Sequence, residues 1–111
     1  MKIFCDSGLR RGCIIFEGEK PILISYECQT TNIGEYKIVI LALEEILRRG
    51  LRSVVILSDS ELLVKQVSGE YRCLKAHLIP LRERVRALAQ DLQSTVEWVS
   101  RNENPAGKKL G

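Results

Sequence analysis

The chain has 111 residues, of which 45% are hydrophobic and 28% are charged. These values are typical of one globular domain and exclude an intrinsically disordered chain. The formal net charge is only +3, which permits a nucleic-acid partner without requiring one. No apolar run reaches the roughly 18 residues that a membrane span needs, and the N-terminal pattern is not that of a signal peptide. We expect a single domain over residues 1–111, cytoplasmic, away from the membrane, and monomeric by default.

Three β-rich segments follow one another at the N-terminus. Residues 2–5 and 12–17 are short apolar runs, and residues 22–29 alternate apolar and polar side chains. Alternation is the period of a strand with one buried face. Because short turns join the segments, we expect an antiparallel meander.

A long helix is expected next. Residues 33–49 have apolar side chains over most of the helix circumference, which is typical of a helix buried against a sheet. The N-cap residue types Thr30, Thr31 and Asn32 precede it. Gly50 follows it, where a C-cap glycine belongs.

The second half of the chain predicts two more strands and two more helices. Residues 54–57 form a continuous apolar run, as expected of a central parallel strand. A short helix over residues 61–67 and a long helix over 74–92 follow, and Pro80 should kink the long helix or mark a restart. Residues 95–99 are the last strand.

The resulting order is βββαβααβ. It predicts an α/β fold with a five-stranded mixed sheet, in which three antiparallel strands are followed by parallel pairing. Helices should cover both faces of this sheet.

Three carboxylates stand at positions that converge in this topology. Asp6 ends the first strand, Asp59 follows the buried fourth strand, and Glu35 is expected in the first turn of the long helix. Strand ends of an α/β sheet are where ligands bind. Carboxylates so close repel one another, and Mg²⁺ or Mn²⁺ relieves the repulsion. Such a cluster is able to hold two ions about 4 Å apart for phosphodiester hydrolysis.

Each carboxylate also has an ordinary alternative role. An Asp after a strand is common turn chemistry, and Glu35 would stabilise a helix N-terminus electrostatically. The joint placement of Asp6, Glu35 and Asp59 favours the metal site.

The residues resemble type 1 ribonuclease H over essentially the whole chain. Residues 4–8 (Phe-Cys-Asp-Ser-Gly) look like the family's first-strand motif. Residues 30–36 (Thr-Thr-Asn-Ile-Gly-Glu-Tyr) are similar to its Thr-Asn-Asn-x-Ala-Glu-Tyr helix start, and residues 58–60 (Ser-Asp-Ser) to its Asp-Ser step. Residues 78–81 and 98–101 match its later framework.

The resemblance implies a ribonuclease H-like fold and a role for each of these residues. Asp6, Glu35 and Asp59 would be the catalytic metal ligands, with one or two Mg²⁺ or Mn²⁺ ions as cofactor. The substrate would be the RNA strand of an RNA–DNA hybrid, recognised through its 2′-hydroxyl groups. The residues expected to contact that substrate are Ser7, Gly8, Thr31, Asn32 and Ser60.

The C-terminus departs from the family pattern. The family motif is Asn-x-x-Ala-Asp-x-Leu-Ala, whereas residues 104–111 read Asn-Pro-Ala-Gly-Lys-Lys-Leu-Gly. Lys108 therefore stands where the family has a fourth carboxylate, and the terminal helix is expected to be truncated. The ammonium group of Lys108 has three alternative effects there. It would oppose a second ion by like-charge repulsion, replace part of the metal's charge, or turn away into solvent.

The resemblance therefore implies a metal-dependent endoribonuclease acting on RNA–DNA hybrids, with activity reduced by Lys108. The alternative is a catalytically impaired module that binds hybrids. A purely structural or interaction domain is a third hypothesis, because the fold alone does not determine function.

Cysteine usage leaves one further question open. The four cysteines, Cys5, Cys13, Cys28 and Cys73, lack zinc-finger spacing and are expected to be small core residues. Cys5 and Cys13 would lie close enough on a hairpin for a disulfide, which the sequence neither requires nor excludes.

Overall fold

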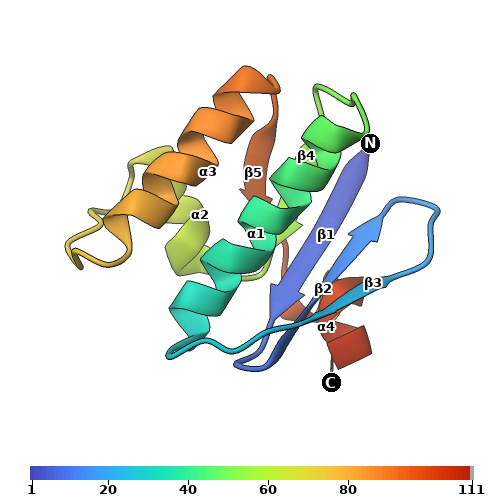
Figure 1. The fold of residues 1–111 in the computed structure, drawn as a ribbon, viewed down its shortest axis with the longest axis horizontal. Coiled ribbons are helices and arrows are strands. Elements are labelled where there is room, and N and C mark those ends of the chain that lie inside the picture. Colours follow the sequence, from blue (N-terminus) through green and yellow to red (C-terminus); the bar gives the residue numbers. More distant parts are fainter. Residues whose placement is uncertain (111) are drawn as a thin grey trace.

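The computed structural model describes residues 1–110, and Gly111 lies outside them. A five-stranded sheet of order β3-β2-β1-β4-β5 forms the centre of the molecule (Figure 1). Its strands are β1 (Lys2–Ser7), β2 (Arg11–Phe16), β3 (Ile22–Ser25), β4 (Val55–Ser58) and β5 (Thr95–Trp98). β1, β2 and β3 pair antiparallel, whereas β4 pairs parallel with both β1 and β5. The predicted mixed sheet is confirmed.

Helices cover both faces of the sheet, as predicted. On one face lie α1 (Thr31–Arg48), α2 (Glu61–Ser68) and α3 (Ile79–Asp91), as Figure 1 shows. After a 3₁₀ turn over Arg101–Glu103, α4 (Pro105–Leu110) packs on the opposite face against β1 and β2. None of the helices within residues 1–110 combines the length and apolarity that a membrane crossing requires.

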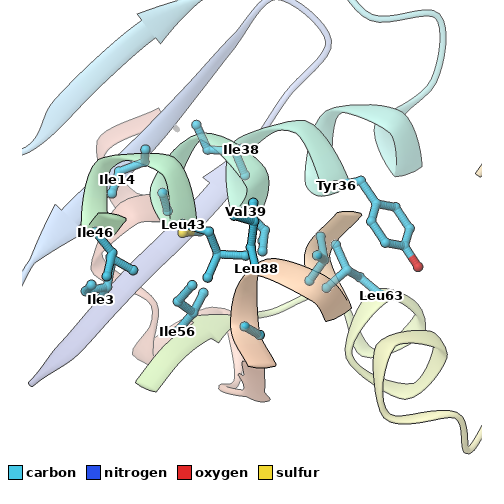
Figure 2. Packing of buried hydrophobic residues seen from close by; sticks show 14 of the residues in the cluster. Ile3, Ile14, Tyr36, Ile38, Val39, Leu43, Ile46, Ile56, Leu63 and Leu88 are labelled. Atoms are coloured by element: carbon cyan, nitrogen blue, oxygen red, sulfur yellow. The ribbon is translucent and has the colours of Figure 1, made fainter. Parts of the chain in front are cut away.

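The hydrophobic core lies between α1 and the sheet. Figure 2 shows Val39, Leu43 and Ile46 of α1 turned towards Ile3 of β1 and Ile56 of β4. All five side chains are fully buried. Aliphatic residues thus build the part of the core that holds β1 and β4 in place.

The ends of α1 follow from local sequence. The Thr30 side chain accepts a hydrogen bond of 3.2 Å from the backbone N–H of Ile33, which satisfies one of the free donors at a helix start. Gly50 has a φ of +70° just after the helix, a conformation that glycine adopts without steric cost. Both ends agree with the prediction to within two residues.

The predicted long helix over residues 74–92 was wrong in its first part. Helix α3 begins at Ile79, and Pro80 occupies its first turn. Proline suits that position because the amide N–H it lacks would have no partner within the helix. The preceding Leu74 is 79% exposed and does not join the buried face that includes Leu78, and Pro80 marks a start rather than a kink.

The third strand was also predicted too long. β3 ends at Ser25, although the alternation of burial continues to Cys28. Beyond the strand, the N–H groups of Tyr26 and Cys28 donate to the carbonyls of Arg10 and Leu9 at 2.9 Å each. The extended segment therefore continues beside a loop rather than beside a strand.

The cysteines are free thiols. Cys5 pairs in register with Ile14, and Cys13 with Asp6. Neighbouring positions along a ladder send their side chains to opposite faces of the sheet, so Cys5 and Cys13 point apart. All four cysteines are unpaired, and the disulfide that the sequence left open is not formed.

Two adjacent residues of α1 test the core. Ile46 is fully buried and Leu47 is 56% exposed. Ile46→Ala should lower the free energy of unfolding by about 2–4 kcal/mol through lost burial and a cavity. Leu47→Ala should change it by less than about 0.5 kcal/mol. Urea unfolding of both variants checks this, and equal losses would contradict the packing.

Candidate metal centre and its cleft

Three carboxylates from distant parts of the chain meet at one edge of the sheet. Asp6 lies in β1, Glu35 in α1, and Asp59 directly after β4. One oxygen atom of each lies within 4.8 Å of the others. The structure therefore brings together the three side chains that the sequence predicted to converge.

The strand register aligns the two aspartates. β1 and β4 run parallel with Cys5 opposite Ser58. The residues that follow these two, Asp6 and Asp59, therefore lie side by side. Parallel strands carry their ends to the same edge of the sheet. The pairing of β1 with β4, which the hydrophobic core stabilises, thus positions two of the three carboxylates.

Glu35 reaches the same point because α1 approaches β1 closely. A Cβ atom at Gly34 would lie only 2.5 Å from Ser7 Oγ and 3.0 Å from the Gly8 carbonyl oxygen. A Cβ atom there would force Ser7 to shift, so glycine suits the approach that this chain makes. Ser7 is held in turn by a hydrogen bond with the Tyr26 hydroxyl.

The position of Glu35 in α1 differs from the prediction in one respect. Because α1 begins at Thr31, no acidic residue lies in its first turn. The interaction with a helix N-terminus is confined to that turn. The alternative role of Glu35 as a favourable charge at the helix start is therefore wrong.

The cluster is electrostatically unfavourable by itself. Burial, followed by the charges of Asp6 and Asp59, raises the pKa of Glu35 to about 8. Burial, followed by the charge of Asp59, also raises the pKa of Asp6. Glu35 Oε2 is shielded from solvent and has no hydrogen-bond partner among the described residues. Such an orphaned acceptor is costly and suits a cation.

A divalent cation fits this set of donors. The three side chains offer only oxygen atoms, which Mg²⁺ and Mn²⁺ prefer. Within residues 1–110, no ion pair with a lysine or arginine involves Asp6, Glu35 or Asp59. The negative charge is therefore available to a metal.

The carboxylates lie in a cleft of about 630 Å³. Arg101 and Lys108 add two cationic side chains to its lining, and the charge of Arg101 lowers the pKa of Asp6 against the larger effects that raise it. The predicted substrate-contacting residues all line this cleft, namely Ser7, Gly8, Thr31, Asn32 and Ser60.

Asn104 supports the site and was not singled out from the sequence. Its side chain is fully buried, and its amide donates to Cys5 O at 3.0 Å and Asp59 Oδ2 at 3.1 Å. Its Oδ1 accepts from the backbone N–H of Ala106 at 3.2 Å. The signal was present, because Asn followed by Pro is typical of a helix start.

Arg11 belongs to the same C-terminal support. Its guanidinium group donates to the carbonyl oxygen of Leu110 at 2.8 Å and so ties the end of α4 to β2.

The pKa of Glu35 predicts how stability depends on pH without metal. Folding raises the pKa of Glu35 from 4.5 to about 8, so the folded chain favours the protonated form of this side chain. The contribution of protonated Glu35 to the free energy of unfolding is therefore full below about pH 4.5 and is lost as the pH rises to about 8. Glu35→Gln removes this loss. In EDTA at pH 7 it should be more stable than the wild type by on the order of 3 kcal/mol, measured by urea unfolding.

The control for this prediction is Glu44→Gln on the same helix, where the glutamate is exposed. It should keep the pH dependence of the wild type. A Glu35→Gln variant that is no more stable at pH 7 would contradict the buried-charge explanation.

Asn104 predicts a second stability effect. Asn104→Ala removes hydrogen bonds to the Cys5 carbonyl, to the half-buried Asp59 carboxylate and from the Ala106 N–H, and should cost about 1–3 kcal/mol. Asn102 lines the cleft but is exposed, so Asn102→Ala should cost less than about 0.5 kcal/mol. Thermal melting followed by circular dichroism distinguishes them, and equal melting temperatures would refute the role of Asn104.

Comparison with known proteins places this geometry in a family. The sequence model of the family described as "Reverse transcriptase-like" matches residues 2–110. The bifunctional protein Rv2228c of Mycobacterium tuberculosis is 32% identical over 82 residues, which are 73% of this chain and 22% of that protein. An uncharacterized protein of Mycobacterium bovis matches to the same extent. The chain thus spans about a fifth of the length of these relatives.

Solved structures share the fold. The ribonuclease H1 of Halobacterium salinarum superposes with a TM-score of 0.84 at 21% identity, covering 98% of this chain and 92% of that chain. The N-terminal ribonuclease H domain of Rv2228c gives 0.83 at 24%, covering 99% and 88%. LC11-RNase H1 in complex with an RNA/DNA hybrid gives 0.81 at 22%, covering 98% and 91%. The chain belongs to the reverse-transcriptase-like family and is a domain of the type 1 ribonuclease H fold.

Proposed function

We propose that this chain is a metal-dependent endoribonuclease that hydrolyses the RNA strand of RNA–DNA hybrids. The observation that carries the proposal is the convergence of Asp6, Glu35 and Asp59 to within 4.8 Å, with no salt bridge to any of them among residues 1–110. A cluster of this kind has no evident structural purpose, since it raises the pKa of Asp6 and Glu35 and leaves Glu35 Oε2 unpartnered. The hybrid bound to LC11-RNase H1, a protein of the same fold, supports the substrate class.

The three carboxylates are the residues that would hold Mg²⁺ or Mn²⁺. When bound, the metal supplies activation of the attacking water and neutralisation of charge at the scissile phosphate. Asn104 orients Asp59 through its 3.1 Å hydrogen bond, and the close approach at Gly34 orients Glu35. These contacts keep the oxygen atoms at fixed positions before substrate arrives.

The remaining cleft residues would bind and orient the hybrid. Ser7, Gly8, Thr31 and Asn32 line the same cleft as the carboxylates and offer backbone and side-chain groups for 2′-hydroxyl contacts in the minor groove. Ser60 uses its hydroxyl to accept from the N–H of Leu63 at 3.2 Å, so its hydroxyl hydrogen remains free to donate. Contacts to 2′-hydroxyls would distinguish the RNA strand from DNA.

Cleavage of a labelled hybrid tests the proposal. Asp59→Asn keeps the size of the side chain and removes its charge, so cleavage in Mg²⁺ should fall by on the order of 100-fold or more. Asp91 is exposed and lies outside the described lining of the cleft, so Asp91→Asn is the matched control and should cleave as the wild type does.

The same assay distinguishes the alternatives. Equal cleavage by the wild type and Asp59→Asn would refute the proposal. Hybrid binding that weakens with salt but gives no metal-dependent cleavage would favour the catalytically impaired binding module. The absence of both would leave a structural domain.

Lys108 predicts a gain of activity. Lys108→Asp replaces a cationic group of the cleft with an additional oxygen ligand and should raise the cleavage rate roughly tenfold, equivalent to about 1.4 kcal/mol. Lys109→Asp makes the same charge change at an exposed position outside the described cleft lining and should not raise it. An unchanged rate in Lys108→Asp would contradict the assignment of the missing ligand to this residue.

A further inference from the structure

The cleft contains both signs of charge, and they do not pair. Asp6, Glu35 and Asp59 share its lining with Arg101 and Lys108. None of the five takes part in an ion pair within residues 1–110. Neither cation forms a salt bridge with a carboxylate of the described residues, so both contribute positive charge to the cleft as a whole.

The side of the cluster that faces α4 offers no further oxygen ligand from a side chain. A Cβ atom at Gly107 would lie 3.1 Å from Asp6 Oδ2 and 3.6 Å from Asp59 Oδ2, so the backbone of α4 lies directly against these two oxygens. Asp59 Oδ2 also accepts a hydrogen bond from the Asn104 amide. The next residue, Lys108, is exposed at the edge of the cleft.

The balance of charge sets how many divalent cations the cleft accommodates. When all three carboxylates are deprotonated, they and the two cations of the cleft lining leave one net negative charge, which a single divalent cation already exceeds. A second ion would add two positive charges to a cleft that Lys108 and Arg101 also line, without a side-chain ligand from α4. Like charges that share one cleft repel each other.

We infer that this cleft binds one divalent cation, held by Asp6, Glu35 and Asp59, and that Lys108 together with Arg101 provides the positive charge that a second ion would supply. The inference rests on the proposed metal site and specifies its stoichiometry. It assigns Lys108 the role of supplying positive charge to the cleft at the position where a ligand for a second ion is missing.

Counting bound Mn²⁺ tests the inference without measuring catalysis. The free hexaaqua ion gives an electron paramagnetic resonance signal that is lost on binding, so a titration of the full chain yields the number of ions bound. The wild type should bind one Mn²⁺, and Lys108→Asp should bind two. Lys109→Asp, with the same change in net charge outside the cleft, should bind one.

Each outcome is decisive. Two ions in the wild type would overturn the inference and leave the proposed function intact, whereas no bound ion would refute both. One ion in Lys108→Asp would overturn the role assigned to Lys108, provided that circular dichroism shows the variant to be folded. Lys108 is exposed, so we expect its substitution to leave folding unchanged.

Discussion

The parallel pairing of β1 with β4 is the constraint on which the rest of the site depends. Cys5 lies opposite Ser58, and this register sets Asp6 beside Asp59. A shift of the register by one residue would turn the side chains of one strand to the other face of the sheet. The fully buried Ile3 and Ile56 oppose such a shift, so the same core that stabilises the fold also aligns the carboxylates.

The site is formed at the expense of local stability. Burial and mutual repulsion raise the pKa of Asp6 and Glu35, which means that the folded chain without metal opposes the charged state of these groups. A bound cation would reverse this effect, because it favours the deprotonated carboxylates. Packing around Gly34 and the hydrogen bonds of Asn104 compensate by holding the cluster rigid, as expected where unfavourable charge is retained for function.

Helix α4 distinguishes this chain from the pattern of the family it resembles. Asn104 and Arg11 fasten the helix to the sheet through hydrogen bonds to Asp59 and Leu110, although the helix covers only Pro105–Leu110. Its backbone closes one side of the carboxylate cluster at Gly107, and Lys108 adds a positive charge at the rim. The C-terminal segment thus contributes the positive charge of Lys108 to the cleft instead of a fourth carboxylate.

Local signals in the sequence determined most of the elements and the identity of the three carboxylates. Three kinds of signal involve only a few neighbouring residues: the alternation of apolar and polar side chains, apolar runs, and capping residues such as Thr30 and Gly50. They can therefore be recognised in the sequence without knowledge of the fold. The start of α3 at Ile79 and the end of β3 at Ser25 were mispredicted, because tertiary contacts decide where such patterns stop. Only the tertiary structure revealed the buried Asn104 amide and the unpaired charges, since both depend on distances between residues far apart in the chain.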